Sequence, residues 1–232
     1  LAFSVNWSSE EKRVNRGAGK LFSIIDRKIE VTKESLENDL SAGLWGSGTG
    51  KQMDGIQKLI PAQTTATQAA SSNTIGGQAI SQSWWQSQGI DMTGYSSLTY
   101  LENYMFNMFN TIQINNGQTD WLLMDQTVYE TYWKNARDMI FTSPTKIADL
   151  TFDLCKFMSK PMIFDEKAPA GEMRFVDKRR FQFCVDPEWW MKWSDWQSFL
   201  NVPFTDAKHI ICVLNTVRTG AREHGCIFNI TE

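Results

Sequence analysis

An apolar stripe at helical spacing runs through residues 18–44 and constrains the fold more than any other feature of this sequence. Its members recur at three- and four-residue steps: Leu21, Ile25, Ile29, Thr32, Leu36, Leu40 and Leu44. At about 1.5 Å per residue the stripe predicts a helix roughly 40 Å long, which is long for a chain of this size. A capping-box spacing from Ser8 to Glu11 introduces the helix, and the glycine-rich run Gly46–Gly50 ends it.

The composition is that of a globular protein and excludes several classes of function. Hydrophobic residues make up 42% and charged residues 21% of the 232 residues, so the chain can bury a core. No apolar run is long enough to cross a bilayer, and we expect no membrane partner. The net charge of −3 argues against a dedicated nucleic-acid binder, although it is compatible with a protein that surrounds nucleic acid.

The segment from Leu59 to Ile90 contains no charged residue. Thr, Gln, Ala, Ser and Asn dominate it, and the pair Trp84–Trp85 lies near its end. Disordered linkers are usually charged or rich in proline, so this composition favours a ribbon that lies against another domain or subunit. An ordinary long loop is the alternative.

Periodicity predicts the remaining elements. A helix begins at Ser97, and Asp125 is placed to cap another helix that follows it. Alternating or continuous apolar runs predict strands at Leu1–Trp7, Trp121–Met124, Pro161–Phe164, Glu172–Val185, Ile210–Leu214 and Cys226–Ile230.

A phosphate loop or a zinc site would need spacings that the sequence does not have. The run Gly46–Lys51 invites comparison with a phosphate loop, but its glycine spacing is wrong and it follows a helix. His209, Cys212, His224 and Cys226 do not have established zinc-ligand spacings. The four cysteines are scattered, which favours reduced thiols. We therefore expect no metal and no cofactor.

One pair of carboxylates could be nominated for catalysis. Asp186 and Glu188 precede Trp189 and Trp190, an arrangement that would suit sugar stacking and general acid–base work. Exposed acids at the junction between a strand and a loop are the favoured interpretation. We therefore expect no catalytic residue, and a carbohydrate-active enzyme is retained only as a minor alternative.

Several segments in a fixed order connect this chain with a known family. After the glycine-rich run come Asp54–Ile56, Thr74–Gly77 with Trp84–Trp85, Asp120–Asp125, Pro161–Asp165, Ala168–Phe175 and Arg222–Ile227. This order resembles the major capsid proteins of tailed bacteriophages, which share the Hong Kong 97-type fold. Gln78–Ala79 departs from that pattern, in which an isoleucine and an acid would follow the glycine pair.

The resemblance implies an α+β fold with a long spine helix and two lobes. A peripheral lobe would comprise residues 1–60, including the spine helix, and strands in residues 186–232. An axial lobe of mixed sheet and helices would comprise residues 61–185. The family's N-terminal arm and extended loop would precede Leu1, and because the first residue is not Met we expect a processed or partial product.

The resemblance also implies a function. The chain would be a structural subunit that self-assembles into pentamers and hexamers of an icosahedral head, enclosing double-stranded DNA without binding it specifically. Scaffold, portal and decoration proteins would be further partners, with assembly in the bacterial cytoplasm and a final location in the virion. An encapsulin-like cellular compartment is the nearest alternative. The candidate subunit-contact residues are Trp84, Trp85, Trp193, Trp196, Phe199 and Phe204.

Overall fold

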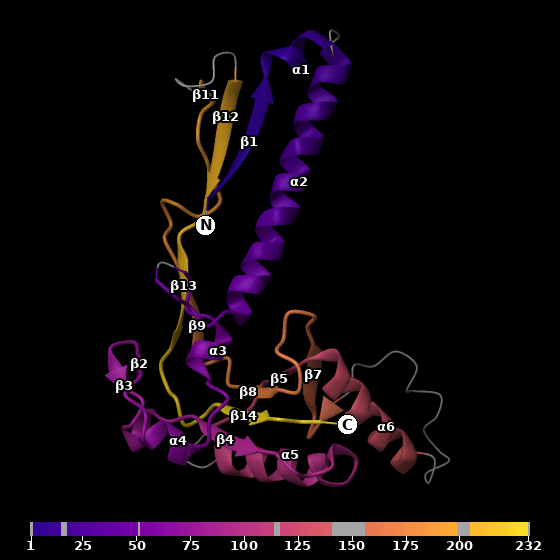
Figure 1. The fold of residues 1–232 in the computed structure, drawn as a ribbon, viewed down its shortest axis with the longest axis vertical. Helices are drawn as coiled ribbons and strands as arrows, with labels where there is room; N and C mark the ends of the chain where they lie inside the picture. Colours follow the sequence, from indigo (N-terminus) through magenta and orange to yellow (C-terminus); the bar gives the residue numbers. More distant parts are fainter. Residues whose placement is uncertain are drawn as a thin grey trace. The chain divides into compact units, whose positions relative to one another are not determined.

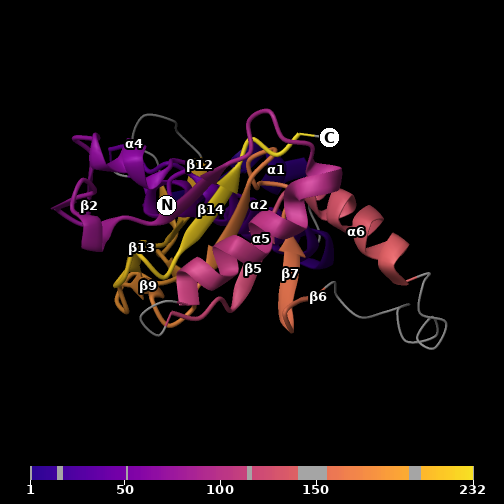
Figure 2. The same ribbon diagram turned by 90° about the horizontal axis from the view of Figure 1, so that it is seen from below.

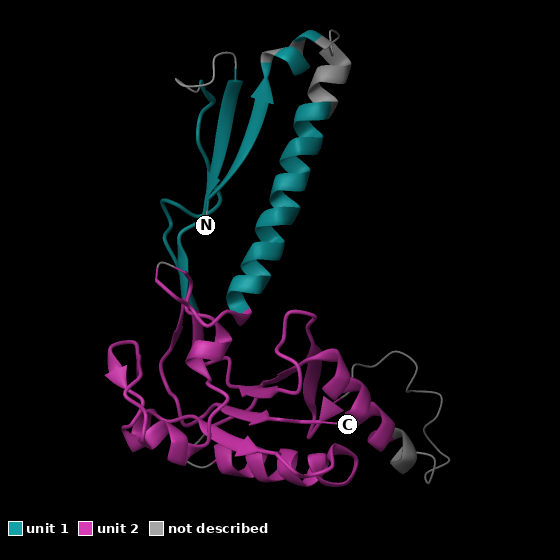
Figure 3. Cartoon of the chain, in the orientation of Figure 1, with its two compact units in different colours: residues 1–44, 183–215 teal, residues 45–182, 216–232 magenta. Residues whose placement is uncertain are grey.

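A computed structural model describes residues 2–14, 18–50, 52–113, 117–140, 156–198 and 205–231 (Figure 1). The chain divides into two compact units (Figure 3). Unit 1 comprises residues 1–44 and 183–215, and unit 2 comprises residues 45–182 and 216–232. No helix among the described residues combines the length and the apolar character that a bilayer span requires.

Unit 1 is built on the predicted long helix, α2 (Ala18–Trp45). The strand β1 (Ala2–Ser8) pairs antiparallel with β12 (Thr205–Ile211) along its whole length, and β10 (Lys192–Trp193) and β11 (Gln197–Ser198) also pair with β12. Leu36 of α2 is buried together with Ile210 and Cys212. The helical stripe and the first predicted strand are therefore confirmed.

The capping box forms as the sequence predicts. It opens the short helix α1 (Ser9–Val14), which precedes α2. The Glu11 amide donates to Ser8 Oγ and the Ser8 amide donates to Glu11 Oε2, both at 3.2 Å. Lys28 of α2 donates to Glu11 and to the carbonyl of Asn6, so the helix is fastened to the end of β1.

Unit 2 is built on a six-stranded mixed sheet in the order β4-β14-β8-β5-β7-β6. The strands are β4 (Gln88–Asp91), β5 (Trp121–Met124), β6 (Lys156–Phe157), β7 (Lys160–Phe164), β8 (Met173–Val176) and β14 (Gly225–Phe228). Two helices, α5 (Ser97–Gln113) and α6 (Gln126–Ile140), flank it (Figure 2). Met105, Met108 and Ile112 of α5 are buried in one core with Leu122, Phe175 and Ile227 of the sheet.

Close packing between α5 and the sheet requires a glycine at the start of β14. A side chain at Gly225 would overlap the side chains of Met108 and Ile112.

Asp125 caps α6 through a hydrogen bond from the Val128 amide to its Oδ1, at 3.4 Å, as predicted.

The uncharged segment folds into short elements of unit 2. They are α4 (Thr65–Ala69), the hairpin β2 (Thr74–Ile75) and β3 (Gln78–Ala79), and the 3-10 turn η1 (Ser83–Trp85), and α3 (Ile56–Leu59) precedes them. A separate two-stranded ribbon pairs β9 (Phe181–Val185) with β13 (Leu214–Arg218).

One predicted strand is wrong. Ile210–Leu214 was expected to be a single buried strand, but β12 ends at Ile211 and β13 begins at Leu214. Between them the Val213 amide donates to the Trp189 carbonyl, and the Val213 carbonyl accepts from Asp186. The chain changes its pairing partner here from β1 to β9, and a run of apolar residues carries no signal of such a change.

The units divide the chain at different residues from the expected lobes. Residues 45–60 and 216–232 were expected to belong to the peripheral lobe, but they lie in unit 2. The reason for the second difference is that β14 is an inner strand of the six-stranded sheet, between β4 and β8. The boundary after the sheet lies within β9, at residue 183 rather than 186.

Candidate functional site

The two tryptophans of the uncharged segment have different environments. Trp84 is 58% exposed. Trp85 is partly buried, its indole Nε1 donates to the Ile75 carbonyl at 3.1 Å, and its ring lies 4.9 Å from the guanidinium of Arg218. The ring centroids of the pair are 5.6 Å apart, so Trp85 supports the exposed indole of Trp84.

Two buried arginines hold this segment against the rest of unit 2. Arg218 donates to the carbonyls of Leu59 and Trp85. Arg174 donates to the carbonyl of Ile60, at 3.2 Å, and forms an ion pair with Glu172. Burial lowers the pKa of Arg218 to about 10, so the guanidinium remains charged at neutral pH and is stabilised by these carbonyls.

A buried glutamine holds the segment to the start of the sheet. The side-chain amide of Gln68 donates to the carbonyls of Gln63 and Ser87, and its oxygen accepts from the Ser87 amide. A side chain at Gly89 would overlap the Gln63 carbonyl, so the segment also lies very close to β4. The polar composition therefore serves packing within unit 2 as well as any contact outside it.

The other candidate contact residues belong to unit 1. Trp196 is 43% exposed, whereas Trp193 packs against the cluster of Leu36, Ile210 and Cys212. The ammonium of Lys208 lies over the Trp193 ring at 5.5 Å. Phe199 and Phe204 lie outside the described residues.

The nominated carboxylate pair lies in a turn of unit 1. The Asp186 carboxylate accepts from the Glu188 amide at 2.9 Å, and the Asp186 carbonyl accepts from the Trp189 amide. Asp186 thus holds the exit from β9, which is the structural role favoured on sequence grounds. Trp189 and Trp190 are both exposed.

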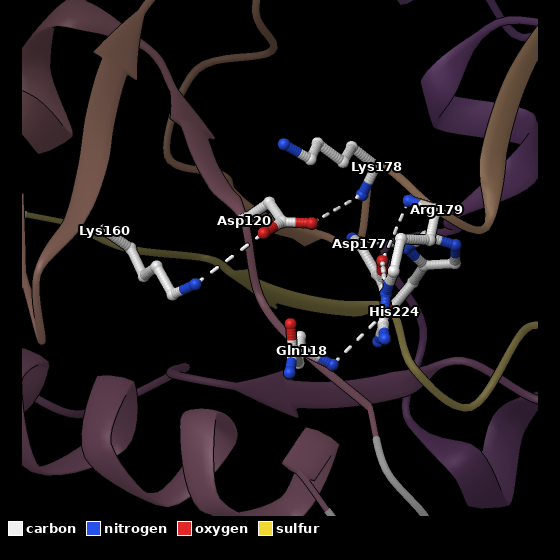
Figure 4. Close-up of polar contacts among 7 residues, drawn as sticks. All are labelled: Gln118, Asp120, Lys160, Asp177, Lys178, Arg179 and His224. Atoms are coloured by element: carbon white, nitrogen blue, oxygen red, sulfur yellow. Dashed lines mark hydrogen bonds and ion pairs between the residues drawn. The ribbon is translucent and has the colours of Figure 1, made fainter.

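A polar cluster gathers at one end of the six-stranded sheet, where β5, β7 and β14 begin and β8 ends (Figure 4). The buried carboxylate of Asp177 accepts from the Arg179 side chain and from the amides of Arg179 and Gln118. Burial raises the pKa of Asp177, but these hydrogen bonds and the charge of Arg179 outweigh burial, so the net shift is downward. Asp120 accepts from the Lys178 amide and pairs with Lys160 at 3.6 Å.

His224 closes this cluster from the interior side. Its Nδ1 accepts from the Asp177 amide at 3.3 Å. Burial, and then repulsion from Arg218, lowers the pKa of His224 to about 4, so the imidazole is neutral at physiological pH. Burial likewise raises the pKa of the Cys226 thiol to about 12.

The four residues considered for zinc belong to different units. His209 and Cys212 lie in unit 1, whereas His224 and Cys226 lie in unit 2. Within the part of the chain that the structure describes, no three His, Cys, Asp or Glu side chains are grouped as metal ligands.

Sequence reasoning missed Arg174, Arg218 and Asp177. Arg174 carried a usable signal, because it stands between apolar residues in the buried strand Met173–Val176. Arginine is almost never fully buried without a partner, so its position in such a strand indicates a bound guanidinium.

Solved structures match this fold along the whole chain. The capsid asymmetric unit of cyanophage A-1(L) matches with a TM-score of 0.66 and 12% identity, covering 100% of this chain and 77% of that one. The holo-SrpI encapsulin complex of Synechococcus elongatus PCC 7942 matches with a TM-score of 0.59 and 8% identity, covering 99% and 73%. The capsid of an empty GTA particle matches with a TM-score of 0.57 and 10% identity, covering 100% and 73%.

Neither a protein-family model nor a curated protein matches the sequence. The structural neighbours are shell proteins, and the chain has their fold. The α+β capsid fold that the resemblance implied is therefore confirmed.

Proposed function

We propose that this chain is a major capsid protein, a structural subunit that self-assembles into the pentamers and hexamers of an icosahedral head enclosing double-stranded DNA. The observation that carries the proposal is the match of the entire chain to phage capsid structures. Closed shells are made by repeated contacts between identical subunits, so this role requires surfaces on the chain that bind other copies of it. Scaffold, portal and decoration proteins would be further partners, and the virion would be the final location after assembly in the bacterial cytoplasm.

An encapsulin-like compartment with a protein cargo is the second candidate. The match to the encapsulin complex supports it, with nearly the same coverage as the phage capsids. The two candidates differ in what the shell encloses, not in how the subunit folds. In both of them the chain is structural and performs no catalysis.

Electron microscopy of the full-length gene product, with mass measured by light scattering, tests this proposal. We expect closed shells or capsomer rings. Double-stranded DNA recovered from shells made during infection would support the capsid role, and shells filled with protein would favour the compartment. If the protein stays monomeric both when it is expressed alone and when the products of its neighbouring genes are co-expressed, both candidates are refuted.

The aromatic candidates are proposed as contact anchors in this assembly. Trp84 is the sharpest of them, because it is exposed while its neighbour Trp85 supports it from below. If Trp84 is buried in a contact, Trp84→Ala should weaken assembly by about 2 kcal/mol or more. Trp196→Ala is the test in unit 1, where Trp193, Phe199 and Phe204 are the other proposed anchors.

The matched control is Trp133→Ala, which removes an indole that is 37% exposed on α6 and lies outside the proposed set. Assembly rates and shell melting temperatures of the three variants would be compared with those of the parent. If Trp84→Ala and Trp196→Ala shells form as fast and melt as high as parent shells, these two anchors are wrong.

A further inference from the structure

Basic side chains are concentrated around the polar cluster at the end of the six-stranded sheet. Lys156 lies on β6 and Lys160 begins β7. The turn after β8 carries Lys178, Arg179 and Arg180, and Arg222 precedes β14. All but Lys160 are exposed. The chain as a whole carries more acidic than basic residues, so we name this local concentration the basic end.

Three acidic side chains are interleaved with the basic end. Asp177 is paired with Arg179 and Asp120 with Lys160, and Glu223 lies beside Arg180 near Gly220. Lys178, Arg180 and Arg222 are exposed, so their positive charges are accessible to a partner. The interleaved carboxylates give the basic end both signs of charge, which an acidic protein surface with basic residues of its own can match and a uniform row of phosphates cannot. The basic end is therefore better suited to a protein partner.

A complementary surface exists on the same chain. Asp26, Glu30, Glu34 and Glu37 of α2 are spaced four, four and three residues apart, so they share one face of the helix, and all four are exposed. Like charges at Asp26, Glu30 and Glu34 destabilise a helix at this spacing, and the exposed Lys33, three residues after Glu30 and four before Glu37, offsets part of that cost. Leu36 faces the core of unit 1, so the acidic stripe lies on a different face of α2.

We propose that the basic end of one subunit binds the acidic stripe of α2 on a second copy of this chain. This inference rests on the proposed function, because shells are built from contacts in which two different patches of identical subunits meet. Opposite charges on the two patches would guide the subunits into register and exclude contacts between like patches.

Charge reversal at each surface tests the contact. One variant carries Lys178→Glu with Arg180→Glu, which leaves the basic end with a net negative charge, and a second carries Glu30→Lys, Glu34→Lys and Glu37→Lys, which leaves the stripe with a net positive charge. Each variant then presents two patches of the same sign, and we expect each to assemble about tenfold or more slowly than the parent at low salt. A chain that carries both sets of substitutions restores opposite charges between identical subunits, so its assembly should recover. Sedimentation at subunit concentrations below assembly should show the two variants associating with each other but not with themselves.

The control is Lys134→Glu with Lys167→Glu, which changes net charge as much as the first variant at exposed positions that belong to neither surface. Circular dichroism melting of every variant separates loss of contact from loss of folding. Normal assembly of both single-surface variants would overturn the proposal. So would a lack of association between the two single-surface variants in sedimentation while the chain with all five substitutions recovers, since that result places the contact within a subunit.

Two further results separate this proposal from its neighbours. If the Lys178→Glu and Arg180→Glu shells form normally but retain less nucleic acid, the basic end binds nucleic acid and the proposal is wrong. If the parent protein forms no shells under any condition that includes its co-expressed partners, the proposed function fails, and mutual association of the two variants in sedimentation would still report on this contact.

Discussion

The buried His224 should make the stability of unit 2 sensitive to acid. Its imidazole is buried beside Asp177, whose amide donates to Nδ1, and the charges of Arg218 and Arg180 oppose its protonation. Burial is the larger cause, and together these effects lower the pKa of His224 from 6.5 to about 4. In the unfolded chain the imidazole is hydrated and titrates near its ordinary pKa.

The sign of the effect follows from proton uptake. Between pH 6.5 and 4 the unfolded chain holds a proton at His224 that the folded chain does not. The free energy of unfolding therefore falls as the pH falls, by up to about 1.4 kcal/mol per pH unit. Across this window His224 should remove about 3 kcal/mol of stability, and below pH 4 it should remove no more.

Urea unfolding of the parent and of His224→Asn between pH 4 and 8 measures this contribution. The asparagine amide oxygen can accept from the Asp177 amide as Nδ1 does, but it does not titrate. Carboxylates such as Asp177 also lose stabilising interactions in acid, and they do so in both proteins. Between pH 7 and pH 4 we expect the parent to lose about 3 kcal/mol more stability than His224→Asn loses. Parallel pH profiles would refute the buried, neutral imidazole.

The other predictions concern folding and are measured by urea unfolding against the parent. Gly89→Ala should destabilise by about 2–3 kcal/mol, because its methyl group would overlap a backbone carbonyl, and Gly225→Ala by less, because flexible side chains can move aside; equal effects would contradict this order. Ser8→Ala removes one hydrogen bond of the capping box and should reduce stability by about 1 kcal/mol, whereas Ser8→Thr, which keeps the hydroxyl, should not. Arg218→Met leaves two carbonyls without their donor and should destabilise by about 2–4 kcal/mol, a loss that Arg218→Lys repairs only in part.

Local signals in the sequence were sufficient for the elements that depend on neighbouring residues. The stripe of α2, the capping box at Ser8 and the cap at Asp125 each rest on contacts within a few residues, and each is confirmed. The strand predicted at Ile210–Leu214 failed because its break depends on which distant strand each half pairs with. A hydrophobic run indicates that its residues are buried, but it does not indicate which strand they pair with.

The sequence singled out Trp84 and Trp85 as candidate contact residues but did not indicate which of the two is exposed. Adjacent tryptophans at positions 84 and 85 look alike in sequence. The Ile75 carbonyl and the guanidinium of Arg218, which is more than 130 residues away along the chain, hold the Trp85 indole and leave that of Trp84 exposed. The same is true of the polar cluster at the basic end. Gln118, Asp177 and His224 come from three separate segments that meet only when β5, β8 and β14 pair.

The absence of charge from residues 59–90 has a physical reason inside the fold. Arg174 and Arg218 bring two positive charges into the interior, and backbone carbonyls of Leu59, Ile60 and Trp85 stabilise them. A lysine or arginine in this segment would add like charge beside two buried guanidiniums, and a carboxylate there would compete with the carbonyls for them. An uncharged segment can supply main-chain acceptors and still present neutral polar surface with an aromatic anchor to a partner. The composition that suggested a contact ribbon is therefore what both roles demand, and Trp84 is the residue at which the two roles can be tested separately.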